Sequence, residues 1–227
     1  MNHKSVRYYL LSLNLGINSC RLHYAALRFF FSKILKEPFT LEEVPIKKRL
    51  KQLPKVISKN DILKMISNTK NLKHKLIIET LYSSGLRLSE LQNLKRKNID
   101  FDNNTINVHL GKGKKDRITI LSPSLFVDLL KYISKTDFKT SYLFEGRTGK
   151  YSKKTIQKVI EKAGKTIGIK ATPHMLRHSF ATHLLEQGTS IHTIKNLLGH
   201  KSVKTTQIYT KTTKLNLKEI PNPLDKR

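Results

Sequence analysis

The sequence has little cysteine, no tryptophan and few acidic residues. Cys20 is the only cysteine among 227 residues, which excludes an internal disulfide and any metal cluster held by several cysteines. No apolar run approaches the roughly 18 residues that a membrane-spanning helix requires. The first residues also lack the apolar core of a signal peptide. We therefore expect a cytoplasmic protein without a membrane partner.

The shortage of acidic residues leaves a large positive charge. Asp and Glu number 16 against 44 Lys and Arg, so the formal net charge is +28. A charge of this size repels itself unless a polyanion neutralises it, and nucleic acid is the commonest intracellular polyanion. Ribosomal, chromatin and surface-binding proteins share this bias, so composition alone does not identify the partner. The basic residues are spread along the chain, which indicates folded basic surfaces.

The spacing of apolar residues predicts a mainly helical protein with a small antiparallel sheet. Residues 18–35 have helical spacing, with Ser19 as the expected N-cap and Leu22, Phe29, Phe30 and Ile34 on the apolar stripe. Pro38 ends this helix, and a basic, proline-containing linker follows up to residue 54.

After the linker the pattern is again mostly helical. Ser58 and Asp61 form a helix start. Gly85 ends a helix that begins near residue 73, and another begins at Ser89. Alternation predicts two strands that contain Ile106 to Leu110 and Ile118 to Ile120, joined by a basic hairpin. Further helices are expected at about 123–134, 152–166, 174–187, 190–198 and 202–210.

The segment that begins at His174 carries candidate chemistry. His174 and Arg177 are three residues apart on the predicted helix, so both face the same side. Leu176, Phe180 and Leu184 form an apolar stripe on another side, and we expect the basic pair to face out of the core. Taken alone, this pair is more typical of a solvated basic surface than of a functional site.

Other motifs accompany this pair. They are Gly85-Leu-Arg87-Leu-Ser-Glu90, Gly111-Lys112-Gly-Lys-Lys-Asp-Arg117, Leu198-Gly-His200, and Tyr209 nine residues further on. In this order and spacing they closely resemble the tyrosine recombinases, the phage integrase and Xer family. The resemblance covers roughly residues 17–211 and implies the catalytic fold of that family. It leaves open whether the chain resolves chromosome dimers or integrates phage or plasmid DNA.

The resemblance implies a catalytic set of six residues, namely Arg87, Lys112, His174, Arg177, His200 and Tyr209. Arginine presents forked donors that match phosphate oxygens, so the two arginines would hold the scissile phosphate. The lysine would protonate the leaving 5′ oxygen, and the tyrosine would be the nucleophile. His174 would assist proton removal and His200 would bond to the phosphate, and we expect both histidines to titrate near neutral pH. We expect Glu90 to pair with a basic group.

The implied function is site-specific recombination of DNA through a covalent 3′-phosphotyrosyl intermediate. The expected partners are double-stranded DNA at a specific recombination site and identical or related subunits in a tetramer, with location at the nucleoid. The sequence contains no P-loop and no carboxylate cluster for two metal ions, so we expect no cofactor. Two alternatives are a catalytically impaired DNA-binding relic and relaxation of DNA in the manner of a type IB topoisomerase.

The resemblance also implies a domain organisation. Residues 1–53 correspond to a shortened helical, SAM-like core-binding domain that resembles only the last two helices of the family domain. Residues 54–211 correspond to the catalytic domain. Residues 212–227 form a tail that either packs on a neighbouring protomer or is a frayed terminus.

Overall fold

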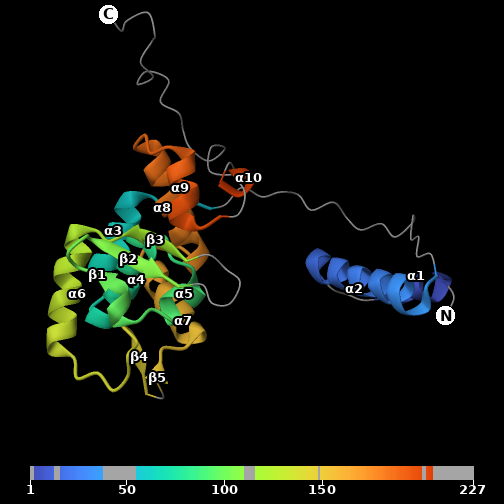
Figure 1. Cartoon of the computed structure of the whole chain (residues 1–227), viewed down its shortest axis with the longest axis horizontal. Coiled ribbons are helices and arrows are strands. Elements are labelled where there is room, and N and C mark those ends of the chain that lie inside the picture. The colour runs from blue at the N-terminus through green and yellow to red at the C-terminus, as the bar shows by residue number, and fades with distance from the viewer. Residues whose placement is uncertain are drawn as a thin grey trace, which may run out of the picture. The chain divides into compact units, whose positions relative to one another are not determined.

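The chain divides into two units, which are described separately. A computed structural model describes residues 3–12, 16–37, 55–109, 116–147, 149–200 and 203–206. The first unit spans Met1–Gln52 and the second spans Leu53–Arg227 (Figure 1). Among the described residues, no helix combines the length and apolar character needed to cross a membrane.

Residues 3–12 and 16–37 are the described part of the first unit, and they form two helices. Helix α1 spans His3–Ser12, and helix α2 spans Ile17–Phe29 and continues as a π-helix over Phe30–Leu35. Val6, Leu10 and Phe31 form its small core. The residue that precedes α2 is Gly16, so the expectation that Ser19 caps this helix is wrong.

The apolar stripe predicted on α2 is mostly exposed. The exposed fractions are 71% for Leu22, 63% for Phe29, 43% for Phe30 and 62% for Ile34. The core of this unit instead uses residues of α1 together with Phe31. Helical spacing therefore identified the helix correctly, but it did not identify the face that is buried.

The second unit is built around a helix that has several fully buried apolar residues. This helix is α4, Leu72–Ser84, in which Leu76, Ile77, Ile78 and Leu81 are fully buried. The surrounding helices are α3 (Lys59–Ser67), α5 (Leu88–Gln92), α6 (Pro123–Lys135), α7 (Lys153–Lys165), α8 (Pro173–Glu186), α9 (Ile191–Leu198) and α10 (Val203–Thr206). In Figure 1, α8 and α9 lie at the opposite end of this unit from the β4–β5 pair. The predicted helices are therefore confirmed within the described residues.

Side-chain oxygens fix the starts of many of these helices. The capping residues are Ser58, Asn71, Ser122, Ser152, Thr172 and Ser190. Each accepts a hydrogen bond from a backbone N–H in the first turn, a group that has no partner inside the helix. The helix start predicted at Ser58 and Asp61 is confirmed, with an Asp61 N to Ser58 Oγ distance of 3.1 Å.

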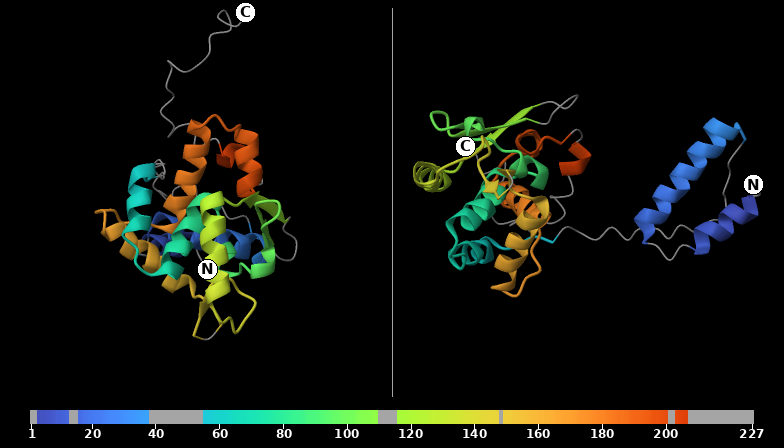
Figure 2. Two further views of the ribbon diagram at one scale, coloured as in Figure 1. Left: turned by 90° about the vertical axis from the view of Figure 1, so that its left-hand side faces the viewer. Right: turned by 90° about the horizontal axis from the view of Figure 1, so that it is seen from below.

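A three-stranded antiparallel sheet lies on one side of the helices (Figure 2). Its strands are β1 (Ile99–Asp100), β2 (Thr105–Val108) and β3 (Arg117–Ile120), in that order. The two predicted strands are confirmed as β2 and β3. Strand β1 and the short pair β4 (Glu145–Gly146) and β5 (Gly149–Lys150) were not predicted. Strands of two residues carry too little alternation to be recognised in a sequence.

Strand β3 has an unusual distribution of polar and apolar residues. Arg117 and Thr119 face the interior, while Ile118 and Ile120 are 60% and 40% exposed. The inward residues form polar contacts, since the Thr119 hydroxyl donates to the Ser84 carbonyl at 2.8 Å. Strand β3 is therefore joined to the helices by hydrogen bonds at its inner face.

Candidate active site

Two helices of the second unit end in glycines that expose backbone carbonyls. Helix α4 ends at Gly85 and helix α9 ends at Gly199, both in the left-handed conformation, with φ of 59° and 62°. This conformation is readily accessible to glycine. The last carbonyls of a helix lack partners within the helix and carry its negative dipole end. These two ends provide acceptors for positively charged side chains.

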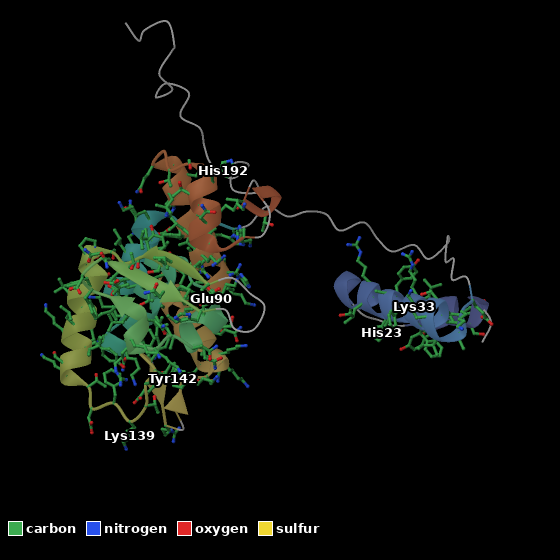
Figure 3. All side chains as sticks on the ribbon, in the orientation of Figure 1. His23, Lys33, Glu90, Lys139, Tyr142 and His192 are labelled. Carbon is green, nitrogen blue, oxygen red and sulfur yellow. The ribbon has the colours of Figure 1, made fainter. Side chains whose placement is uncertain are left out.

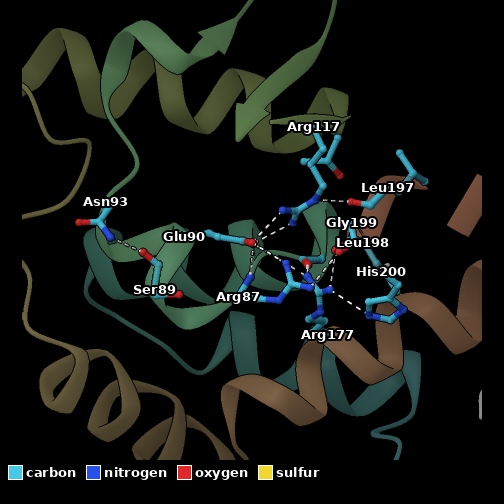
Figure 4. Close-up of polar contacts among 12 residues, drawn as sticks. Arg87, Ser89, Glu90, Asn93, Arg117, Arg177, Leu197, Leu198, Gly199 and His200 are labelled. Carbon is cyan, nitrogen blue, oxygen red and sulfur yellow. Dashed lines mark hydrogen bonds and ion pairs between the residues drawn. The ribbon is translucent and has the colours of Figure 1, made fainter. Parts of the chain in front are cut away.

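Three arginines bind the carbonyls at the end of α9 (Figure 4). Arg117 Nε donates to the Leu197 carbonyl at 2.7 Å, and an Nη atom of Arg177 donates to the Leu198 carbonyl at 2.7 Å. An Nη atom of Arg87 donates to the Gly199 carbonyl at 3.2 Å. Arg177 also donates to the Gly85 carbonyl. The three side chains come from β3, from α8 and from the residue that precedes α5, so three distant segments converge at one point.

Glu90, which Figure 3 labels on the second unit, lies among these arginines (Figure 4). Its side chain is only 3% exposed, and both Arg87 and Arg117 donate to its carboxylate at 2.7–2.8 Å. Arg177 Nη1 lies 3.9 Å from the same carboxylate. The expected pairing of Glu90 with a basic group is confirmed. Burial alone would raise the pKa of Glu90, but the contacts with Arg117 and Arg87 lower it to about 2.

His200 completes the cluster. Arg177 lies 3.2 Å from His200 Nε2, and Thr206 Oγ1 lies 2.9 Å from Nδ1. Because a guanidinium only donates, Nε2 accepts, and the proton of the neutral ring resides on Nδ1 and is donated to Thr206. Burial, together with Arg177, Arg87 and Arg117, lowers the pKa of His200 to about 4. The expectation that His200 titrates near neutral pH is therefore wrong for the protein without DNA.

The structure also corrects the expected orientation of Arg177. Its side chain is 5% exposed, so it does not form a solvated basic face. Its cost of burial is offset by the carbonyls of Gly85 and Leu198. Leu176 and Phe180 are buried as predicted, at 0% and 5%. Helical spacing alone did not predict that Arg177 would be buried beside Leu176 and Phe180.

The remaining predicted residues differ in their placement. His174 is exposed on the first turn of α8, and its ring stacks on His178 with centroids 6.3 Å apart. Burial, His174 and Arg177 lower the pKa of His178 to about 4. Lys112 and Tyr209 lie outside the described residues. The structure thus brings together Arg87, Arg177 and His200 of the six predicted residues.

The cluster is suited to bind an anion. Three guanidinium groups and one carboxylate leave two net positive charges, because His200 is neutral. Arg87 keeps 34% of its side chain exposed, so solvent and solutes reach the cluster at this residue. No group of three or more His, Cys, Asp or Glu side chains within the described ranges could hold a metal ion. This charge and these forked donors suit an anion of the size and geometry of a phosphate.

Comparisons with known proteins show which family the chain belongs to. Residues 55–215 match the model of the phage integrase family. The chain is 40% identical over 216 residues to tyrosine recombinase XerA of Pyrococcus horikoshii, which covers 93% of this chain and 73% of that protein. A crystal structure of XerA recombinase matches with a TM-score of 0.66 and 32% identity, over 92% of this chain and 78% of that one.

A further solved structure is that of XerH site-specific recombinase bound to difH substrate in a pre-cleavage complex. It matches with a TM-score of 0.76 and 25% identity, covering 92% of this chain and 67% of that chain. The fold and the site define the chain as a tyrosine-type, site-specific DNA recombinase. The chain belongs to the phage integrase family.

Sequence reasoning missed Arg117 as a member of the cluster. It lies in the quoted basic motif, just before the strand predicted to contain Ile118 to Ile120, and the sequence analysis gave it no role. Alternation gave no usable signal, because it would place Ile118 and Ile120 on the inner face, whereas Arg117 and Thr119 occupy that face in the structure.

Proposed function

We propose that the chain exchanges DNA strands by attack of the Tyr209 phenol on a phosphate that is bound by Arg87, Arg177 and His200. The observation that supports this proposal is the convergence of these three side chains on the carbonyls at the ends of α4 and α9. The phosphate would enter beside Arg87, the most exposed of the cluster arginines.

In the proposed reaction the Tyr209 oxygen forms a bond to phosphorus while the bond from phosphorus to the 5′ oxygen breaks. The phenol proton leaves with assistance from His174, and Lys112 supplies a proton to the departing 5′ oxygen. The arginines and His200 stabilise the charge that builds on the non-bridging oxygens. Rejoining is the reverse attack by a 5′ hydroxyl. The phosphodiester energy is kept in the phosphotyrosyl bond, so neither ATP nor a metal ion is required.

We propose that the partner is double-stranded DNA at a specific recombination site, which would place the protein at the nucleoid. Residues 1–53 would act as a partial core-binding domain and residues 54–211 as the catalytic domain. Strand exchange would take place in a tetramer of identical or related subunits, with residues 212–227 packing on a neighbouring protomer. Segment 212–227 lies outside the described residues.

The nucleophile is tested by Tyr209→Phe on a nicked DNA substrate that traps the covalent adduct. The variant should lose the adduct entirely and keep its DNA affinity, because only the attacking oxygen is removed. Tyr142→Phe is a matched control, since its ring lies near Lys95 and Lys150 and is not part of the cluster. An adduct of normal yield with Tyr209→Phe would refute the assignment.

Three measurements on the wild-type chain separate the alternatives. Adduct formation by the wild-type chain would exclude a catalytically impaired relic. Relaxation of a supercoiled plasmid that carries no paired second site would favour the topoisomerase-like activity. Exchange that requires two sites on the DNA would support the tetramer.

A further inference from the structure

Among the basic side chains around Glu90, Arg117 is almost as deeply buried as Arg177. Its side chain is 6% exposed. Nε donates to the Leu197 carbonyl at 2.7 Å, and both Nη atoms donate to Glu90 at 2.8 Å. All three nitrogens of its guanidinium are thus engaged by the protein itself. These bonds use three of its five N–H groups, and its side chain is nearly buried, so Arg117 acts mainly through the residues that it holds.

The contacts of Arg117 join three elements that carry the cluster. They connect β3 to the start of α5 through Glu90, and β3 to the end of α9 through Leu197. Gly199 leaves no room between them, because a Cβ atom there would lie 2.8 Å from Arg117 Cδ. The arginine is therefore packed directly against the turn that presents His200.

Glu90 transmits the effect of Arg117 to the arginine nearest the solvent. One Glu90 oxygen accepts from both Arg87 Nη1 and Arg117 Nη1, and the other accepts from the Arg87 backbone N–H and from Arg117 Nη2. If Arg117 were absent, this buried carboxylate would keep its charge with half of these bonds. With half of its bonds lost, Glu90 would hold Arg87 less firmly in the position that binds a phosphate.

We propose that Arg117 is a positioning residue of the recombination reaction: paired with Glu90 and anchored on Leu197, it holds Arg87 and the His200 turn in the geometry that binds the scissile phosphate. This inference rests on the proposed function of the cluster. Arg117 is joined to the cluster by a bidentate ion pair, so lysine at this position keeps the charge and loses the geometry.

The test compares Arg117→Gln and Arg117→Lys with the wild-type chain in single-turnover adduct formation at saturating enzyme. We expect Arg117→Gln to slow the adduct step by about 100-fold, because a small displacement of positioned catalytic groups has an effect of this size. The dissociation constant for DNA should change by less than about threefold. Arg117→Lys should recover part of the rate. Arg96→Gln is the matched control, because Arg96 also binds two backbone carbonyls but lies outside the cluster.

A pH profile distinguishes positioning from a general loss of structure. The charged groups around Glu90 are Arg87, Arg117 and Arg177. Glu90 and His109 also line one small cavity of about 20 Å³. Without Arg117, the pKa of Glu90 rises, and the adduct rate of Arg117→Gln should fall as the pH is lowered from roughly 7 to 5. Glu90 stays ionised in the wild-type chain over this range. His109 is present in both proteins, so the difference between the two profiles reports Glu90.

A double variant completes the experiment. If Arg117 acts through Glu90, Glu90→Gln combined with Arg117→Gln should be about as slow as the slower single variant, because both changes break one unit. A folded Arg117→Gln protein with an adduct rate within about twofold of the wild type would overturn the proposal. Losses that multiply in the double variant would overturn it as well. If Arg117→Gln does not fold, the same criteria apply to Arg117→Lys. Failure of the wild-type chain to form any adduct would instead refute the proposed function.

Discussion

At the scale of single residues, the cluster keeps its histidine neutral. His200 accepts from Arg177 at Nε2 and donates to Thr206 at Nδ1, so its uncharged form makes two hydrogen bonds. A positive ring would place a further cation beside three arginines. A negatively charged phosphate would reverse this preference, since it would favour the protonated ring. We therefore expect the charge of His200 to depend on whether an anion occupies the cluster.

The depressed pKa of His200 predicts how stability changes with pH. The unfolded chain binds this proton below about pH 6.5 and the folded chain only near pH 4, so the contribution to stability is lost as the pH falls between these values. We expect the loss from this partly exposed ring to be on the order of 1 kcal/mol. His200→Gln should remove that loss in urea unfolding at pH 7 and pH 4.5. His192→Gln, at an exposed position of α9, is the control, and equal pH dependence in all three proteins would contradict the assignment.

At the scale of elements, the site depends on two helix ends that glycine makes possible. Gly85 and Gly199 turn the chain at the ends of α4 and α9, and the freed carbonyls bind the arginines. Neither glycine has space for a side chain. A Cβ atom at Gly85 would lie 2.4 Å from the Phe180 ring, so the turn also packs against the core of α8 and α9.

Gly85→Ala is predicted to lower the free energy of unfolding of the second unit by more than the strain of the left-handed backbone alone would. Both Gly85 and Gly188 have positive φ, 59° and 84°, but a Cβ atom at Gly188 meets nothing within 4 Å. Gly188→Ala should therefore cost about 1 kcal/mol for the left-handed backbone. Gly85→Ala should cost about 1–3 kcal/mol more, because Phe180 must shift. Urea unfolding of both variants measures the difference. Equal losses would show that the contact with Phe180 does not matter.

The elements of the second unit could be predicted from the sequence more completely than the cluster. Helix starts at Ser58 and Ser190 and helix ends at Gly85 and Gly199 are local signals that operate within a few residues. The burial of Arg177 and Arg117 depends on carbonyls more than 20 positions away along the chain. Periodicity assigns charged residues to the surface, so it does not detect a buried cation that is satisfied by distant backbone.

The order and spacing of the motifs identified some of the site residues that periodicity did not detect. Arg87, Arg177 and His200 were selected by resemblance, and the structure brings them together. Arg117 was not selected, although it lies in the same network. A residue that acts only by holding others carries no chemical signature in its own segment, and its role becomes visible only from its contacts.

At the scale of the whole molecule, the excess of positive charge is not balanced internally. The chain has 44 basic and 16 acidic residues, and the most deeply buried acid that is described, Glu90, serves only the cluster. On α7, the buried residues Ile156, Val159 and Ile160 lie opposite exposed lysines such as Lys154 and Lys158. Of the basic residues that the structure describes, only Arg117 and Arg177 are buried, so most of their charge lies on surfaces from which a polyanion can release counterions.

The binding of DNA is accordingly predicted to weaken steeply with salt. If Z phosphates are neutralised by lysine and arginine, the logarithm of the binding constant should fall linearly with the logarithm of the salt concentration, with a slope near −0.9Z. Six to ten such contacts would reduce the affinity by about 10³–10⁵ between 50 and 200 mM salt. Fluorescence anisotropy of a labelled duplex at several salt concentrations measures the slope. The Tyr209→Phe variant should give the same slope as the wild-type chain, because a phenol oxygen releases no counterion. An affinity that does not change with salt would show that the charge of +28 is not used in binding DNA.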